Sequence, residues 1–445
     1  MERVISRYLS PKIEHSGRAI YEATEETSDK MNETMPLLTP IKIGNKTAAN
    51  RIAINAMECC DAETNGNPSE TAFRRYDRLS RGNAGVIIVE ALSVVDENRG
   101  RLHQLTALPQ NQKGLADLVA AMRKANPKPL ILWQLTHSGE LSSPEFSERV
   151  CVKPFPGYEG RLLAEEEADE ILERFVFAAK MASDCGADGV DFKLCHGYLG
   201  SQLVRPFNDR KWKYGGSWAN RTRFAYEFYE RVSKEVKNKD FILGSKISAW
   251  EGLPGGMGSA GPDTPIIDLT EVLDLVKGLE ARGAKYVVQS AGNPSLTLAL
   301  TQPDKKIPDY SYLHFWFQKE FRKVMKSETV LIGSAYSLFR DGKNSFRGVK
   351  REESSVEYWG NKNIRDGVCD MVALGRQSLA DPLLPAKLEE GRRNEIKWCT
   401  GCDNCIEFLI RQVPVGCSTH EREYTRELKE IRRQQGVLAE SEKHT

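Results

Sequence analysis

The stretch EEADEILERFVFAAKMASDCGADGVDFKL, residues 166–194, places a long amphipathic segment directly before a short apolar run. The first part has apolar residues at helical spacing and ends at Gly186. A glycine at the end of a helix commonly takes the left-handed conformation that stops it. Residues 188–194 have the length of a buried strand and are bounded by turn residues. This stretch therefore predicts one helix followed by one strand.

Seven further apolar runs of this kind occur along the chain. They are RIAINAM (51–57), GVIIVEA (85–91), LILWQLT (130–136), FILGSKI (241–247), YVVQS (286–290), VLIGS (330–334) and MVALG (371–375). Helical patterns between the runs include residues 112–126, 166–187, 223–238 and 268–284. A doubly wound sheet also alternates strands and helices, but the chain has no early glycine fingerprint of that fold. The pattern therefore predicts an α/β protein with a (β/α)8 TIM barrel, whose active site would follow the strand ends.

Four cysteines near the C-terminus form the pattern C-x2-C-x2-C-x11-C. They are Cys399, Cys402, Cys405 and Cys417. Thiolates spaced by two residues can converge on one centre, and a fourth can return from a following turn. The pattern predicts an iron–sulphur segment. A structural zinc site and a purely structural cysteine group are the alternatives.

Composition excludes several classes of partner. The chain has 445 residues, with 63 basic and 62 acidic side chains and a net charge of +1, so it lacks the basic excess typical of nucleic-acid or anionic-membrane binding. No apolar run approaches the roughly 20 residues that span a bilayer. Ten cysteines are too few for a disulphide scaffold. We expect no nucleic acid, no membrane, a cytoplasmic location and a homo-oligomer.

The predicted organisation has four parts. Residues 1–35 lack sustained periodicity and are expected to form an N-terminal extension. Residues 36–390 would form the barrel, and residues 391–420 the iron–sulphur segment. The sequence of residues 421–445 predicts a charged helix with a tail.

His196 and Tyr198 follow the fourth apolar run, where a barrel strand delivers side chains to an active site. A histidine can donate to a carbonyl or phenolate oxygen, and a tyrosine hydroxyl can deliver a proton to carbon. A satisfied core histidine and a buried tyrosine are the alternative interpretation.

The sequence resembles the FMN-dependent old yellow enzyme family in several segments that occur in family order and at family spacing. They are ANRIAINAM (49–57), WQLTHSG (133–139), CHGYLGSQL (195–203), NDRKWKYGGSWANRTRF (208–224), SKISAWEG (245–252), GRQSLADP (375–382) and the cysteine run. The chain is most similar to the iron–sulphur branch, which contains 2,4-dienoyl-CoA reductase, the enoate reductases and trimethylamine dehydrogenase.

The resemblance implies FMN as cofactor and a set of residues that hold it. The residues placed against the isoalloxazine are Ala56, Met57, Glu58 and Ala91, and those placed at the phosphate are Gly333, Ser334, Ala335, Gly375 and Arg376. Gln134 would read the pyrimidine edge of the ring. Lys246 stands where the family usually has arginine and would lie near N1 and O2. Arg376 could instead be a structural ion-pair residue.

The chain departs from the family near the expected substrate. Lys193 stands at the first of two positions that bind the substrate oxygen, and His196 stands at the second. This would pair an ammonium with an imidazole. Glu58 replaces a residue that is Cys or Thr in many relatives. Its carboxylate should lower the flavin potential or titrate with a raised pKa.

The resemblance implies an FMN- and [4Fe–4S]-dependent oxidoreductase that reduces an activated C=C bond in an α,β-unsaturated carbonyl compound or enoate. Flavin N5 would deliver hydride, His196 with Lys193 would polarise the carbonyl oxygen, and Tyr198 would protonate the α-carbon. No strand–GxGxxG–helix pattern follows Cys417, so we expect the C-terminal FAD and NAD domains of this branch to be lacking. Electrons would then come from NAD(P)H directly or from a separate electron-donor protein.

Two other functions stay open. The C-x2-C-x2-C spacing also suggests an N-demethylating amine dehydrogenase of the trimethylamine dehydrogenase type, although Lys193 would repel a cationic amine. An electron-transfer flavin and iron–sulphur subunit of a larger complex is the third possibility. The loops 140–165, 250–265 and 291–315 are expected to wall the substrate pocket.

Overall fold

A closed barrel of eight parallel strands forms the centre of the computed structural model, which describes residues 35–343 and 350–442. Around the barrel the strands are β12 (Tyr286–Ser290), β13 (Val330–Gly333), β14 (Met371–Leu374), β3 (Ile52–Ile54), β4 (Val86–Ser93), β5 (Leu130–Thr136), β8 (Gly189–Leu194) and β9 (Ile242–Ser248). Each lies within or overlaps one predicted run, so the predicted (β/α)8 barrel is confirmed. The predicted extension over residues 1–35 lies almost wholly outside the described residues.

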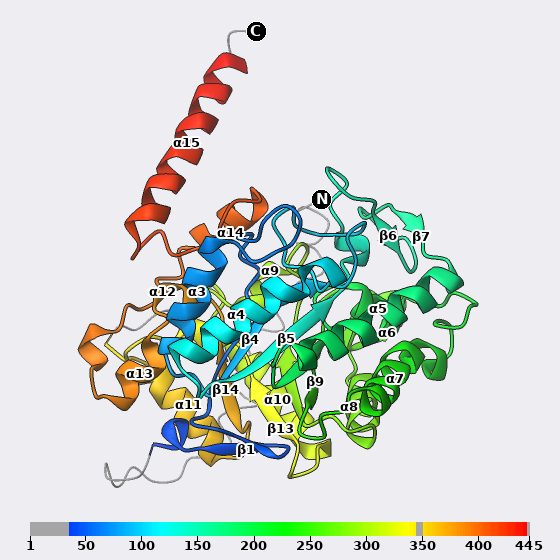
Figure 1. Cartoon of the computed structure of the whole chain (residues 1–445), viewed down its shortest axis with the longest axis horizontal. Helices are drawn as coiled ribbons and strands as arrows, with labels where there is room; N and C mark the ends of the chain where they lie inside the picture. The colour runs from blue at the N-terminus through cyan, green and yellow to red at the C-terminus, as the bar shows by residue number, and fades with distance from the viewer. Residues whose placement is uncertain (1–34, 344–349, 443–445) are drawn as a thin grey trace.

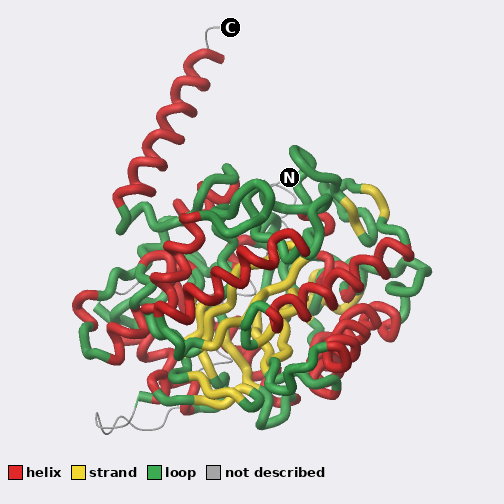
Figure 2. The backbone as a smooth tube through the Cα atoms, viewed as in Figure 1, coloured by secondary structure: helices red, strands yellow, loops and turns green. Residues whose placement is uncertain are grey.

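Helices surround the barrel (Figures 1 and 2). The principal ones are α3 (Glu70–Arg81), α4 (Gln112–Ala125), α5 (Glu165–Asp184), α7 (Trp218–Glu235), α8 (Thr270–Ala281), α10 (Asp309–Val324) and α11 (Val356–Arg365). Gly186, after α5, has a φ of +84°, as predicted for a helix stop. Helix α7 begins earlier than the pattern predicts because the Ser217 hydroxyl accepts the Asn220 N–H and caps it.

Side chains on the strands form two separate apolar layers. In β4, Val86 and Ile88 belong to the cluster that fills the barrel, whereas Ile87 and Val89 belong to the cluster shared with the helices. The hairpin of β1 (Ile41–Ile43) and β2 (Lys46–Ala48) adds two fully buried apolar side chains to the inner cluster. The interior is therefore a packed core, as barrels of this size require, and ligands bind only at its end.

Shorter elements follow the strands or connect the helices. They are η1 (Pro36–Leu38), η2 (Pro109–Asn111), η3 (Gly139–Leu141), β6 (Val150–Cys151), β7 (Arg161–Leu162), α6 (Leu199–Val204), β10 (Ser259–Gly261), β11 (Thr264–Ile267), α9 (Leu298–Thr301), η4 (Tyr336–Leu338), η5 (Glu352–Ser354), α12 (Arg376–Ala380), α13 (Leu384–Glu389) and η6 (Arg393–Glu395). Among the described residues, no helix has the length and apolar character needed to cross a membrane.

The C-terminal part packs beside the carboxyl end of β3. Helix α14 (Asn404–Ile410) and helix α15 (Arg422–Glu442) contribute Phe408, Leu428 and Ile431 to an apolar cluster that also contains Cys59. The Val415 N–H donates to the Cys59 carbonyl at 2.8 Å. Helix α15 then projects away from the barrel (Figure 1). The cysteine-rich segment, which is the predicted iron–sulphur segment of residues 391–420, is therefore joined to the barrel at the strand end that carries predicted flavin residues.

Candidate active site

A pocket lies at the carboxyl ends of the barrel strands and encloses about 1010 Å³, its open mouth included. Most of the predicted substrate and flavin residues line it. They are Ala56, Met57, Glu58, Gln134, Lys193, His196, Tyr198, Lys246, Ser334, Ala335, Gly375 and Arg376. Barrel closure therefore brings together side chains that are more than 300 residues apart in the sequence.

Two predicted flavin residues, Ala91 and Gly333, do not line the pocket. Ala91 is fully buried in β4, and its carbonyl oxygen accepts from the Gln104 side chain at 2.8 Å. Gly333 ends β13, and a methyl group at its position would overlap the Gln318 amide. Both residues are therefore packed against other protein atoms and do not face the pocket.

Glu58 is bonded to three donors in the pocket. Its Oε1 accepts from Lys193 Nζ at 2.8 Å and from the Tyr198 hydroxyl at 2.5 Å, and its Oε2 accepts from Arg101 Nε at 3.2 Å. Burial alone would raise the pKa of Glu58, but the charges of Lys193 and Arg101 outweigh it and lower the pKa to about 2. Of the two expectations for this carboxylate, the raised pKa is contradicted and Glu58 is an anion at neutral pH, whereas the lowered flavin potential stays a prediction.

Tyr198 is a protonated phenol with a cation above its ring. Lys193 Nζ lies 3.2 Å from the centroid of the Tyr198 ring. Burial and the neighbouring Glu58 charge raise the pKa of Tyr198 to about 12, against a smaller opposing effect of Lys193. The phenol therefore keeps its proton at neutral pH and points it at Glu58.

His196 is a neutral imidazole on the opposite side of this group of interactions. Its Nε2 lies 2.7 Å from Ser290 Oγ, and its backbone N–H donates to Ser248 Oγ at 3.1 Å. Burial and the positive charges of Lys246 and Lys193 hold the pKa of His196 well below its usual value. Lys193 is bonded to Glu58, and both Lys193 and His196 line the pocket. Their expected binding of one substrate oxygen stays a prediction.

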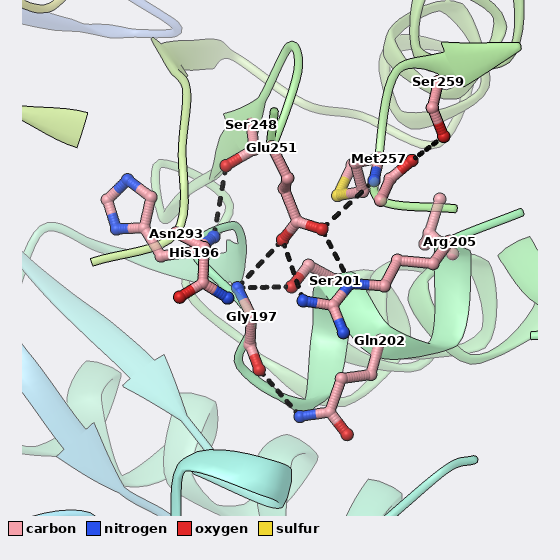
Figure 3. A network of polar contacts seen from close by, with 12 residues as sticks. His196, Gly197, Ser201, Gln202, Arg205, Ser248, Glu251, Met257, Ser259 and Asn293 are labelled. Atoms are coloured by element: carbon pink, nitrogen blue, oxygen red, sulfur yellow. Dashed lines mark hydrogen bonds and ion pairs between the residues drawn. The ribbon is translucent and has the colours of Figure 1, made fainter. Parts of the chain in front are cut away.

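A buried ion network supports the turn that carries His196 and Tyr198 (Figure 3). Glu251, which is 0 % exposed, accepts the Gly197 N–H at 2.9 Å through Oε1 and Arg205 Nε at 2.6 Å through Oε2. Arg205 also pairs with Glu140 at 2.7 Å. His196 and Gly197 have φ angles of +65° and +83°, and the left-handed region is unfavourable for a residue other than glycine. The Glu251 contact holds this turn in place.

Lys246 and Gln134 are buried residues that also line the pocket. Lys246 Nζ donates to Asn55 Oδ1 at 3.2 Å, and burial lowers the pKa of this lysine. Gln134 Nε2 donates to Asp191 Oδ2 at 2.5 Å, and burial raises the pKa of Asp191 to about 6. The Lys246 ammonium and the Gln134 amide can therefore bind polar atoms at the edge of a ring-shaped ligand.

Small residues follow β13 and β14. Ser334 Oγ is buried and has no hydrogen-bond partner within residues 35–343 and 350–442, and a methyl group at Gly375 would meet only Met57 Sδ, at 3.2 Å. Arg376 pairs with Asp403 and also donates to the Pro303 carbonyl, both at 2.5 Å. Arg376 therefore has the ion pair of the alternative interpretation, although it also lines the pocket.

The cysteine-rich segment touches the pocket but forms no compact metal site. Cys405 belongs to the same apolar cluster as Met57, and Asp403, the partner of Arg376, lies between Cys402 and Cys405. Among the residues that the structure describes, no group of three or more His, Cys, Asp or Glu is placed to hold a metal ion. A tetrahedral zinc site and an iron–sulphur cluster both need several thiolates around one centre, so this finding favours neither of them.

Several pocket residues escaped the sequence-based interpretation. The pocket is also lined by Asn55, Arg101, Ser290, Pro294, Leu298, Thr301, Gln302, Pro303, Ser337, Leu338, Ile406 and Leu409. Of the three loops expected to wall it, only 291–315 supplies lining residues. Asn55 lies within a predicted run and could have been chosen, whereas no local pattern marks Arg101.

The residues 36–286 match the model of the NADH:flavin oxidoreductase / NADH oxidase family. The chain belongs to this family. Family membership supports FMN as cofactor and an oxidoreductase activity. The pocket suits such a group, because it joins a buried ammonium, an unpartnered Ser334 hydroxyl and a glycine at Gly375 where a bulky ligand can approach the backbone.

Relatives in this family differ in length and in the activity for which they are named. The chain is 30 % identical over 383 residues to an NADH oxidase from Thermoanaerobacter brockii, covering 83 % of this chain and 53 % of the relative. It is 26 % identical over 418 residues to a cinnamate reductase from Clostridium sporogenes, covering 87 % and 58 % respectively. The chain spans about half the length of these curated relatives.

Solved structures support the fold. A 2-naphthoyl-CoA reductase in complex with 2-naphthoyl-CoA superimposes with a TM-score of 0.72 and 20 % sequence identity. The match covers 88 % of this chain and 57 % of that one. At this identity the likeness bears on the barrel architecture alone.

We predict that Glu251→Gln lowers the free energy of unfolding by about 3 kcal/mol or more, because it removes one carboxylate from a buried guanidinium. The control is Glu148→Gln, at an exposed ion pair with Arg161, which should cost about 0–1 kcal/mol. Denaturant unfolding of both variants measures the difference. Equal effects would contradict the supporting role of Glu251.

Proposed function

We propose that the protein is an FMN-dependent reductase of an activated C=C bond in an α,β-unsaturated carbonyl compound or enoate. The observation that carries this proposal is the single pocket that contains the Tyr198 phenol, the His196 imidazole and the predicted flavin residues. The family match and the similarity to a cinnamate reductase support it.

The proposal assigns the part of the pocket around Lys246 and Gln134 to FMN. Ala56 and Met57 would lie against the ring, Gln134 and Lys246 at its polar edge, and Ser334 with Gly375 at the phosphate. The bound cofactor would supply a hydride, which carries the two electrons of the reduction. A buried ammonium at Lys246 favours negative charge at the ring edge.

Tyr198 supplies the proton that the reduction requires. The β-carbon of the substrate gains the hydride, and the α-carbon gains the phenolic proton, so that the double bond becomes a single bond. The tyrosinate left behind lies next to the Lys193 ammonium, which stabilises it until solvent returns a proton. In the resting pocket the phenolic O–H donates to Glu58, so this hydrogen bond breaks and the O–H turns toward the α-carbon before the proton is transferred.

His196 binds the carbonyl oxygen. The proposal requires the tautomer in which Nε2 accepts from the Ser290 hydroxyl, so that the neutral ring carries its proton on Nδ1 and can donate it to the substrate. Such a hydrogen bond strengthens as negative charge develops on the oxygen. Lys193 acts through Glu58 and Tyr198.

We predict that Tyr198→Phe slows reoxidation of the reduced enzyme by an enone or enoate about 10²- to 10⁴-fold, the usual contribution of a positioned acid. Flavin reduction by the donor should be nearly unchanged, because it needs no proton from this phenol. Stopped-flow absorbance of the flavin separates the two half-reactions. The control is Tyr358→Phe, at a partly exposed site on α11. Normal reoxidation in Tyr198→Phe would remove the phenol from the mechanism.

The four cysteines are proposed to hold a [4Fe–4S] cluster. Cys399, Cys402, Cys405 and Cys417 supply the thiolate set that such a cluster binds, and Cys405 shares an apolar cluster with Met57 of the pocket. Reducing equivalents would enter from NAD(P)H or from a separate donor protein. A reducing cytoplasmic setting and a homo-oligomer belong to the same proposal.

Anaerobically purified protein is predicted to contain about four irons per chain and to absorb near roughly 400 nm beyond the flavin contribution. Cys402→Ser should lose both signals, because it removes one thiolate. Cys151→Ser, at a buried cysteine in β6 outside the motif, is the control and should keep them. One zinc and no iron per chain would instead identify a structural metal site.

The charge of the pocket argues against the two rival functions. An amine dehydrogenase would bind a cationic substrate. At the substrate end of the pocket, which is the part around Glu58 and Tyr198, two cations (Lys193 and Arg101) accompany one carboxylate (Glu58). An electron-transfer subunit would need no substrate pocket, whereas this barrel has an open one. Bleaching of the oxidised flavin by a secondary or tertiary amine would favour the amine dehydrogenase.

A further inference from the structure

We infer that Arg101 is the residue that binds the carboxylate of an enoate substrate, and that Gln412 of the cysteine-rich segment positions Arg101. The inference rests on the proposed reductase function and narrows its substrate class.

Among the charged side chains that line the substrate end of the pocket, cations outnumber carboxylates. Two cations, Lys193 and Arg101, pair with one carboxylate, Glu58, at 2.8 and 3.2 Å. His196 adds no negative charge, and the other cations, Lys246 and Arg376, lie toward the proposed flavin positions. A partly buried charge without a counter-ion is unfavourable, so an anionic ligand relieves a cost that a neutral one does not.

Arg101 has donors left for such a ligand. Its Nε donates to Glu58, and its Nη1 makes only a long contact, 3.4 Å, with the Gly100 carbonyl oxygen. A guanidinium has five N–H donors in a planar fork that matches a carboxylate. The side chain lines the pocket and is 24 % exposed, so a bound substrate can reach it without a rearrangement of the protein.

Gln412 binds the backbone on both sides of Arg101. Its Oε1 accepts the Leu102 N–H at 3.2 Å, and its Nε2 donates to the Gly100 carbonyl at 3.4 Å. Gln412 itself has a φ of +58°, an uncommon conformation for a residue with a side chain. One amide thus fixes the loop after β4 from a segment about 310 residues away in the sequence.

The cysteine-rich segment also supplies part of the pocket wall. Ile406 and Leu409 of α14 line the pocket, and Leu409 lies three residues before Gln412. The segment therefore shapes the substrate end of the site in addition to any role in electron transfer. Changes in this segment should alter substrate preference as well as the flow of electrons.

The test compares acids with their methyl esters, which keep the activated double bond but lose the charge. Suitable pairs are cinnamate with methyl cinnamate and crotonate with methyl crotonate. The measured quantity is the ratio of kcat/KM for the acid to kcat/KM for the ester. The holoenzyme should prefer the acids, and Arg101→Gln should lower this ratio about 10- to 100-fold through loss of a charge-assisted bidentate contact. Arg101→Lys keeps the charge without the fork and should give an intermediate ratio.

Two further variants separate positioning from general damage. Gln412→Ala should lower the acid-to-ester ratio in the same direction as Arg101→Gln but by less, because the guanidinium remains. Arg433→Gln, at an exposed pair on α15, is the matched control and should leave the ratio unchanged. Binding without turnover can be measured with the saturated acid 3-phenylpropanoate, which shifts the flavin spectrum when it binds. Its affinity should be lower in the Arg101 and Gln412 variants than in the wild-type holoenzyme.

The outcomes distinguish this inference from the proposed function. Reduction of neither acids nor esters by the wild-type holoenzyme would overturn the reductase proposal itself. Reduction of the esters with an acid-to-ester ratio that Arg101→Gln and Arg101→Lys leave unchanged would overturn the carboxylate inference alone. A ratio that falls in the Arg101 variants but not in Gln412→Ala would reject the positioning role of Gln412.

Discussion

The pairing of β14 with β3 is the constraint on which the site depends. Ala373 lies opposite Ala53 and Leu374 opposite Ile54, so the last strand closes the barrel against the first. Closure places Gly375 beside Met57 and directs every strand end to one face. The pocket is a consequence of this geometry, because its lining residues come from several strands and from the loops that follow them, and none of these segments could form the site alone.

Within the pocket, the Glu58 carboxylate holds together the groups at the substrate end. Glu58 is shared by an ammonium, a guanidinium and a phenol that arrive from different strands and loops. Behind it, Glu251 holds the left-handed turn that presents His196 and Tyr198. The two carboxylates have different tasks: Glu251 is fully buried and holds the backbone, whereas Glu58 faces the ligand and sets its charge environment. Both tasks depend on paired cations, since an isolated buried carboxylate would take up a proton.

The sequence predicts the features that local pattern controls. The eight strands, the glycine stop at Gly186 and most pocket residues follow from short runs and from family motifs around them. Local pattern does not decide between the two expectations for Glu58, a lowered flavin potential or a raised pKa, because the cations that lower its pKa, Lys193 and Arg101, come from other parts of the chain. The same reason explains why Arg101 was missed: a lone arginine in a loop has no periodicity, and its partner Gln412 belongs to a separate segment. Long-range contacts decide the chemistry of this pocket, and they require the fold.

The most direct test of this account is the binding of FMN to the protein from which flavin has been removed. Titration with FMN should give one tightly bound flavin per chain, with quenched fluorescence and a yellow holoprotein. Lys246→Met, at the proposed ring edge, should weaken the binding. A protein that stays colourless with excess FMN under exclusion of oxygen would contradict the account.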